Sequence, residues 1–234
     1  MAKLFTSSVG KKFLMAVTGG AMLLFVIGHM VGNLQFFLGE EAINRYGHLL
    51  QSNVELLWPM RIGLLAVIAL HGWSAVQIAR ENRAARPVQY ANWNPTVASY
   101  ASRTMLMGGV IIGVFVIYHL LHYTAMVQAV NFTGQDFHTL TDAKGRHDIF
   151  KMMVLGFSQP LVVGFYVLAI GMLCLHLSHG VSAMFQSLGL KNATYSGLID
   201  NASKLIALGL FAGYVSIPVA VLFLGYGRGG CCFK

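Results

Sequence analysis

The sequence predicts an all-α integral membrane protein with five transmembrane helices in a single domain, residues 1–234. Of the 234 residues, 56% are hydrophobic and only 10% are charged, whereas a soluble domain usually carries about 25% charged residues. The apolar residues also gather into five stretches long enough to cross about 30 Å of hydrocarbon as helices. Such stretches are too long for the strands of a membrane barrel. This composition excludes a disordered chain and disfavours a water-soluble globule.

The predicted spans cover approximately residues 13–38, 57–79, 105–130, 153–180 and 205–227. The first follows basic residues, so a signal peptide is the competing interpretation. Its apolar run, however, continues past His29 to Leu38 without a clear small-residue cleavage site. The second span ends near Arg80, the third starts after Arg103, and the fifth starts after Lys204. The segment 135–148 is the most polar stretch, and we expect it to form a loop outside the membrane.

Charge gives the orientation of these spans. The chain has 16 Lys and Arg against 8 Asp and Glu, a formal charge of +8. In a soluble protein this excess would suggest nucleic acid, but in a membrane protein it is typical of loops facing the cytoplasm. The clearest basic clusters lie in the N-terminal tail and between the second and third spans, at Lys3, Lys11, Lys12, Arg80, Arg83 and Arg86. We therefore expect a cytoplasmic N-terminus and no nucleic-acid partner.

The informative polar residues are histidines within the spans. Ionisable residues inside a membrane are rare and indicate function by default. At 1.5 Å per residue, His29 and His119 are expected about 24 Å and 22 Å from the inner ends of their helices. On the same rise, His71 is expected about 13 Å and His176 about 6–8 Å from theirs. The first four helices thus offer two layers, each with one histidine from each of two helices.

Two facing imidazoles at one depth suit a haem, whose iron needs one axial ligand on each face. The sequence therefore predicts the first four helices bundled around two stacked b-type haems, one held by His29 and His119, the other by His71 and His176. A lone membrane histidine is more often a packing or proton-relay residue. A zinc site is the chemical rival, but it would need three or four converging protein ligands.

Several residues near these sites keep two interpretations. His122 and His179 each lie one turn beyond a predicted ligand and share its helix face. Lys12, Ser102 and Arg103 are predicted to hold haem propionates at the inner edge, or else to be solvated residues at helix ends. The paired cysteines Cys231 and Cys232 have no predicted role.

Seven segments together resemble one known family: SSVGKKFLMAVTG, FVIGHMVGNLQFF, INRYGH, ENRAARP, ASRTM, FVIYHLLHY and LHLSHGVSAMFQSLGLK. The chain is similar to the single-chain, five-helix, di-haem cytochrome b subunit of succinate:quinone oxidoreductases, in particular to the bacterial succinate dehydrogenase type. The resemblance covers all five spans. Its ligand positions fall on His29, His71, His119 and His176, and in that family they form the same two pairs.

The resemblance implies an enzyme complex whose flavoprotein subunit oxidises succinate and whose iron–sulfur subunit passes electrons through the proximal and distal haems to a quinone, expected to be menaquinone. The chain itself has no dinucleotide fingerprint and no cysteine cluster for iron–sulfur. It would be the membrane subunit and would depend on both partners and on lipid. The implied location is the bacterial inner membrane. The implied quinone site lies near the loop between the first and second spans, where His48, Arg45 and Glu55 are candidates or else ordinary surface residues at the membrane interface.

One position departs from the resemblance. Some fumarate-reducing members carry a membrane-embedded Glu two residues before the fourth ligand, where this chain has Cys174. This favours succinate oxidation over fumarate reduction. The alternatives are a haem b subunit of another respiratory enzyme, such as a formate dehydrogenase or hydrogenase, and a haem-free transporter or anchor.

Overall fold

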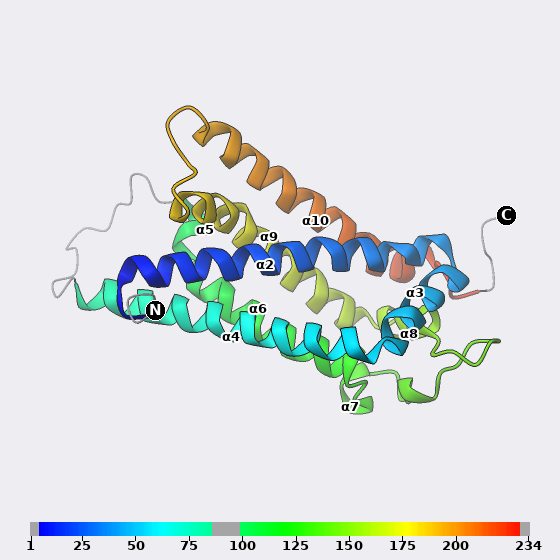
Figure 1. Cartoon of the computed structure of the whole chain (residues 1–234). Helices are drawn as coiled ribbons and strands as arrows, with labels where there is room; N and C mark the ends of the chain where they lie inside the picture. Colours follow the sequence, from blue (N-terminus) through cyan, green and yellow to red (C-terminus); the bar gives the residue numbers. More distant parts are fainter. Residues whose placement is uncertain (1–4, 86–98, 230–234) are drawn as a thin grey trace. The chain divides into compact units, whose positions relative to one another are not determined.

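The computed structural model describes residues 5–85 and 99–229, and within these ranges the chain is all-α (Figure 1). The described part contains no strand, only an isolated antiparallel bridge between Thr141 and His147. The expectations for Lys3, Arg86, Cys231 and Cys232 lie outside the described residues.

Within the described residues, five helices are long and apolar enough to cross a membrane. They are Ser8–Leu38 (α2, Ser8–Leu34, with the 3-10 turn η1, Gln35–Leu38), α4 (Val54–Ala84), Met105–Thr124 (α6, Met105–His119, with the π-helical turn η2, Leu120–Thr124), α9 (Pro160–Ser187) and α10 (Ser196–Leu224). Their mean hydropathy lies between 1.7 and 2.2, and large apolar side chains such as Leu24, Leu161 and Leu168 point outward and are exposed. The prediction of an all-α, multi-pass membrane protein is confirmed.

Several helices begin or end at other residues than predicted, because a proline or a residue with positive φ interrupts the helix there. The third span stops at Thr124 because Met126 has a left-handed φ of 48°. The fourth apolar stretch is divided into α8 (Ile149–Phe157) and α9. Pro160 at the first position of α9 lacks an N–H and is favoured at a helix start. At the other end of α9, Gly189 has a φ of 74°, which suits a glycine after a helix C-terminus.

Short helices connect the spans. They are α3 (Glu40–Ser52), α5 (Tyr100–Arg103), α7 (Gln128–Asn131), the 3-10 turn η3 (Phe137–Thr139) and α8. The first turn of α3 carries Glu40 and Glu41, where carboxylates favour the positive end of the helix dipole. The carboxylate of Asp148 caps α8 by accepting the N–H of Lys151 at 2.9 Å.

The described chain divides into two compact units. Unit 1 comprises residues 1–26, 61–110 and 173–208, and unit 2 comprises residues 27–60, 111–172 and 209–234. Each of the five long helices contributes residues to both units.

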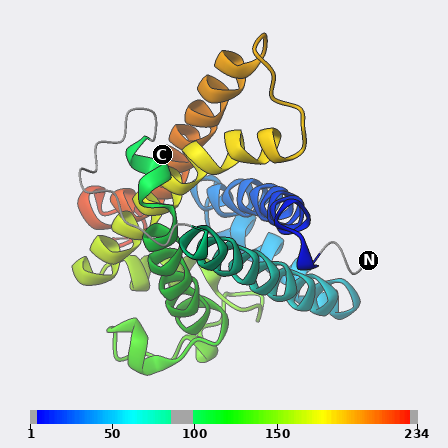
Figure 2. The same cartoon turned by 90° about the vertical axis from the view of Figure 1, so that its left-hand side faces the viewer.

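In unit 1, α2 and α4 lie side by side (Figure 1, Figure 2). The buried ammonium of Lys11 pairs with Glu81, which also accepts a hydrogen bond from the Ser8 hydroxyl at 3.0 Å. This arrangement ties the start of α2 to the end of α4. The sequence indicated Lys11 only as one of the basic residues of the N-terminal tail, and its ion pair was not predicted.

In unit 2, α3 packs closely against α8. A Cβ on Gly47 would overlap the end of the Ile149 side chain, so the glycine lets this side chain lie directly against α3. The fully buried Asn44 donates to Asp148 at 3.1 Å and accepts the N–H of Phe150 at 2.9 Å. These contacts attach the polar segment 135–148 to the helix that follows η1.

Candidate functional site

The first candidate site lies in unit 1, where His71 of α4 faces His176 of α9. Their ring centroids are 6.4 Å apart and their planes are inclined by 61°. The two residues are 105 positions apart in the sequence, so the fold brings together the pair that the helix depths had suggested.

Hydrogen bonds orient His71. Its Nδ1 lies 3.1 Å from the carbonyl oxygen of Met15 and 3.2 Å from the hydroxyl of the buried Thr18. A carbonyl only accepts hydrogen bonds, so Nδ1 carries the proton and Nε2 presents its lone pair. A histidine that binds a metal typically uses this arrangement, with the second ring nitrogen donating to a backbone carbonyl.

Glycines of neighbouring helices lie next to both rings of this pair. A Cβ on Gly19 would lie 3.3 Å from Cε1 of His71, which is a tight contact, and a Cβ on Gly109 would lie 3.9 Å from Cε1 of His176. The Nδ1 of His176 is buried and makes no hydrogen bond within the described residues. The backbone of Met105, at the start of α6, nevertheless lies close enough to interact with the His176 ring.

The second candidate site lies in unit 2, where His29 of α2 faces His119 of α6. Their ring centroids are 5.8 Å apart with an interplanar angle of 83°. Tyr214 of α10 lies beside His29, with ring centroids 6.2 Å apart. The Nδ1 of His119 lies 3.2 Å from the hydroxyl of Tyr166 on α9. This pair is drawn from two helices, and residues of two more helices contact it.

The π-helical turn η2 changes the side-chain directions directly after His119. The Ala125 N–H bonds to the Leu120 carbonyl at 2.7 Å, five residues back. With this wider turn, the Nδ1 of His122 also reaches the Tyr166 hydroxyl, at 3.1 Å. Single π turns occur frequently at functional sites. His122 is fully buried.

Both pairs have the spacing of axial ligands to one metal. A ring whose Nε2 binds a metal at about 2 Å has its centre about 3 Å from that metal, so two such rings on opposite sides are about 6 Å apart. The observed centroid distances are 6.4 Å and 5.8 Å. Two imidazoles that bind one metal from opposite sides can rotate freely about the line joining them. Both observed interplanar angles are therefore compatible with such binding. The centroid spacing of each pair is therefore compatible with a haem held between the two imidazoles.

The same geometry disfavours the zinc alternative. Within residues 5–85 and 99–229, no three His, Cys, Asp or Glu side chains gather as a metal site. A protein zinc site needs three or four such ligands, whereas a haem brings four nitrogens of its own and needs only two. A pair of histidines is therefore sufficient to hold a haem but insufficient to form a protein zinc site.

The predicted propionate partners lie in unit 1, the unit of the His71–His176 pair. Lys12 and Arg103 are exposed and make no ion pair within the described part of the chain. Ser102 donates its backbone N–H to the Ser99 hydroxyl at the start of α5. No described hydrogen bond joins these three side chains to the histidines, so their role stays a prediction. His179, one turn beyond His176, interacts electrostatically with Lys191 and Asp200 instead.

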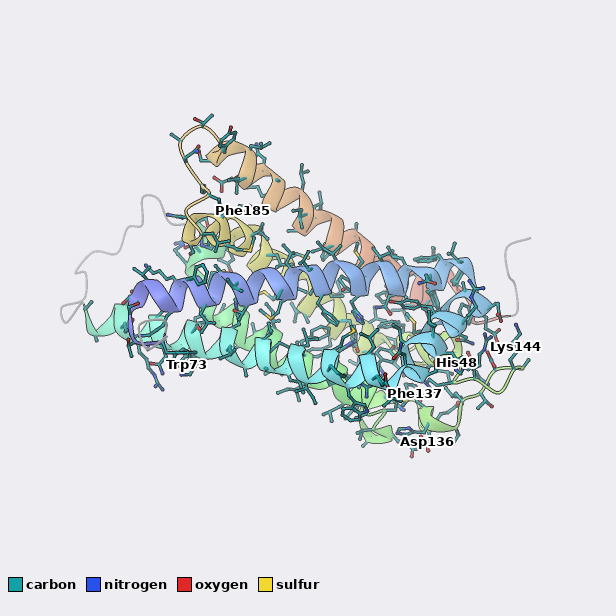
Figure 3. All side chains as sticks on the ribbon, in the orientation of Figure 1. His48, Trp73, Asp136, Phe137, Lys144 and Phe185 are labelled. Atoms are coloured by element: carbon teal, nitrogen blue, oxygen red, sulfur yellow. The ribbon has the colours of Figure 1, made fainter. Side chains whose placement is uncertain are left out.

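The predicted quinone-site residues His48, Arg45 and Glu55 all lie in unit 2 and are exposed; His48 is labelled in Figure 3. Cys174 is a buried free thiol on α9, two residues before His176.

Sequence reasoning missed Thr18 and Tyr166, which orient the histidines. Both are polar residues within apolar helices, and each is buried. The sequence shows only that each residue places a hydroxyl group in a membrane span. Such a hydroxyl often bonds to the backbone of its own helix, so its presence does not indicate a contact with a histidine. Thr18 does so too, donating to the Leu14 carbonyl at 2.8 Å.

Comparison with known proteins supplies no further guide. No protein-family model, curated protein or solved structure matches the chain.

Proposed function

We propose that the chain is the haem b-bearing membrane subunit of a succinate:quinone oxidoreductase of the succinate dehydrogenase type. The observation that carries the proposal is the pairing of four histidines from four helices, His71 with His176 and His29 with His119, each pair at the spacing of two axial ligands. The choice of succinate as the donor rests on the family resemblance alone.

The chain's own residues have defined tasks in this proposal. His71 is held by the Met15 carbonyl with its Nε2 lone pair available, and His119 is held by Tyr166. A haem held between two such imidazoles would have no free coordination position, so it would exchange single electrons and would not bind O₂. The hydrogen bonds that orient the rings would tune its reduction potential.

The remaining parts of the enzyme would come from partners. We infer a flavoprotein subunit that oxidises succinate and an iron–sulfur subunit that docks on the side of the N-terminus. The product of the membrane subunit would be a reduced quinone, with menaquinone as the expected substrate. The location would be the bacterial inner membrane with the N-terminus in the cytoplasm, following the basic clusters near the helix ends.

A reduced-minus-oxidised spectrum of membranes that contain the native complex tests this proposal. We expect haem b bands with dithionite and at least partly with succinate. Bands with dithionite but none with succinate, after redox titration has excluded a low potential, would contradict succinate as the donor and favour the formate dehydrogenase or hydrogenase alternative. Absence of haem from correctly assembled protein would contradict the histidine assignment and favour a haem-free transporter or anchor.

A further inference from the structure

Two polar side-chain atoms without partners converge on one glycine in unit 2. The Nε2 of His122 and the hydroxyl of Tyr123 are buried and make no hydrogen bond within the described residues. Both lie against Gly156 of α8: a Cβ there would be 3.1 Å from Nε2 of His122 and closer still to the Tyr123 hydroxyl. Buried polar groups almost always have a partner, and leaving one unpaired costs about 1–3 kcal/mol.

The hydrogen bonds of Tyr166 determine whether the Nε2 of His122 is a donor or an acceptor, and hence which kind of partner it needs. If His119 binds iron through Nε2, its Nδ1 carries a proton and donates it to the Tyr166 oxygen. The single hydroxyl proton of Tyr166 is then free for the Nδ1 of His122. When Tyr166 donates this proton to His122, the ring of His122 carries its own proton on Nε2, the atom beside Gly156. The Tyr123 hydroxyl also has a proton to donate.

Aromatic packing holds both donors in place. The rings of His122 and Tyr123 stack with centroids 3.9 Å apart and planes inclined by 27°. Phe137, labelled in Figure 3, packs against both rings, with its centroid 5.9 Å from that of His122 and 6.4 Å from that of Tyr123, and Phe157 packs against Tyr123 at 5.5 Å. The donors cannot turn outward to solvent without breaking this stack, so their partner must come to them.

We propose that His122 and Tyr123 bind one neutral acceptor oxygen over Gly156. The assignment rests on the proposed function, because the tautomer of His122 follows from haem ligation by His119. A carbonyl oxygen suits two converging donors, since it accepts two hydrogen bonds and donates none. Within the proposed function this oxygen is the carbonyl of the quinone or an ordered water. The site differs from His48, Arg45 and Glu55, which are exposed.

Cryo-electron microscopy of the intact complex, at a resolution that shows ordered waters, tests the proposal. We expect density within hydrogen-bonding distance of both His122 Nε2 and Tyr123 Oη. Density continuous with a flat ring, and lost after quinone extraction, assigns the quinone carbonyl; an isolated peak that survives extraction assigns water. No density between well-resolved side chains overturns the proposal. Haem density is scored separately, so failure of the proposed function is distinguishable from failure of this site.

Variants of the complex give an independent measurement. Gly156→Ala places a methyl group against both donor atoms, and Tyr123→Phe removes one donor without adding volume. If the quinone carbonyl binds there, either variant should raise KM for 2,3-dimethyl-1,4-naphthoquinone about tenfold, equivalent to one lost hydrogen bond, with an unchanged haem spectrum. If water binds there, KM stays unchanged and the density peak disappears from Gly156→Ala. Retention of that peak in Gly156→Ala overturns the proposal.

The matched control is Gly164→Ala in α9 of the same unit. A Cβ at Gly164 meets nothing within 4 Å, so KM, haem content and the density peak should all be as in the unaltered complex.

Discussion

The hydrogen bond from His71 to the Met15 carbonyl shows how one contact can prepare a side chain for a ligand. It places the proton on Nδ1 and leaves Nε2 with a free lone pair. The Tyr166 hydroxyl, 3.2 Å from Nδ1 of His119, orients that ring, but it can either donate or accept the hydrogen bond. Removing a hydrogen-bond partner of a metal-binding histidine typically lowers metal affinity about 10- to 100-fold.

Single substitutions should separate ligands from their neighbours. His119→Ala and His176→Ala should each remove about half of the haem b, because each removes one axial ligand of one haem. His122→Ala and His179→Ala, one turn further along the same helices, should retain both haems. Haem per purified complex, determined as the pyridine haemochrome, measures this. Retention of both haems in His119→Ala, with loss in His122→Ala, would show that the second histidine is the ligand.

Asn44 makes a stability prediction that is independent of any cofactor. Asn44→Ala would leave Asp148 and the Phe150 N–H without their buried partner, which costs about 1–3 kcal/mol. We expect a lower midpoint of thermal unfolding in detergent. His48→Ala, on the exposed side of the same helix, should change stability by no more than about 0.5 kcal/mol. Equal midpoints for the two variants would contradict the role assigned to Asn44.

For individual residues, the sequence predicted the candidate histidines better than it predicted their hydrogen-bond partners. Six histidines in apolar spans were conspicuous, and the fold brings His29 to His119 and His71 to His176 as the depths suggested. The contacts of Thr18 and Tyr166 could not be predicted, because a hydroxyl in a helix gives no sign of whether it bonds within its own helix or across to another.

At the scale of elements, the predicted spans correspond to the five long helices, but their ends do not coincide. Apolar composition sets how far a chain can lie in lipid, whereas a helix continues until its hydrogen bonding is interrupted. Pro160 and the left-handed Met126 are such interruptions. The π turn η2 was not predictable, because one extra residue in a helical turn leaves no mark in the composition.

The loop after η3 makes a pH prediction. Arg146 bonds to Glu41 at 2.7 Å and to Asp142 at 2.6 Å, and Lys144, labelled in Figure 3, bonds to Glu41 at 2.9 Å. The hydrogen bonds from Arg146 and then Lys144 lower the pKa of Glu41 from 4.5 to about 2. Burial alone would raise the pKa of Asp142, but its bonds to Arg146 outweigh this and lower it from 3.8 to about 2.

Because both pKa values are lowered on folding, the stabilisation is complete above about pH 5 and is lost as the pH falls toward 2. Hydrogen exchange in the segment 139–148, corrected for the intrinsic rate, should therefore lose protection over that window. Glu41→Gln should have lower protection already at pH 7 and a flatter profile, while Glu40→Gln should follow the unaltered chain. Identical profiles for all three proteins would show that the ion pairs do not hold the loop.

At the scale of the whole molecule, each compact unit contains one complete histidine pair. This division agrees with a chain that offers two separate sites of one kind. The long helices expose much of their apolar surface, which suits lipid and the proposed partner subunits. Substrate, partners and orientation could not be read from the fold, because those belong to loops and to other chains.

The most direct measurement is the number of haem b groups per chain in the purified native complex, combined with the spin state of the iron. The account predicts about two per chain, both low-spin and six-coordinate, because each of two histidine pairs supplies both axial ligands of one haem. A count of zero, or a high-spin haem open to carbon monoxide at either site, would contradict the pairing on which the proposed function depends.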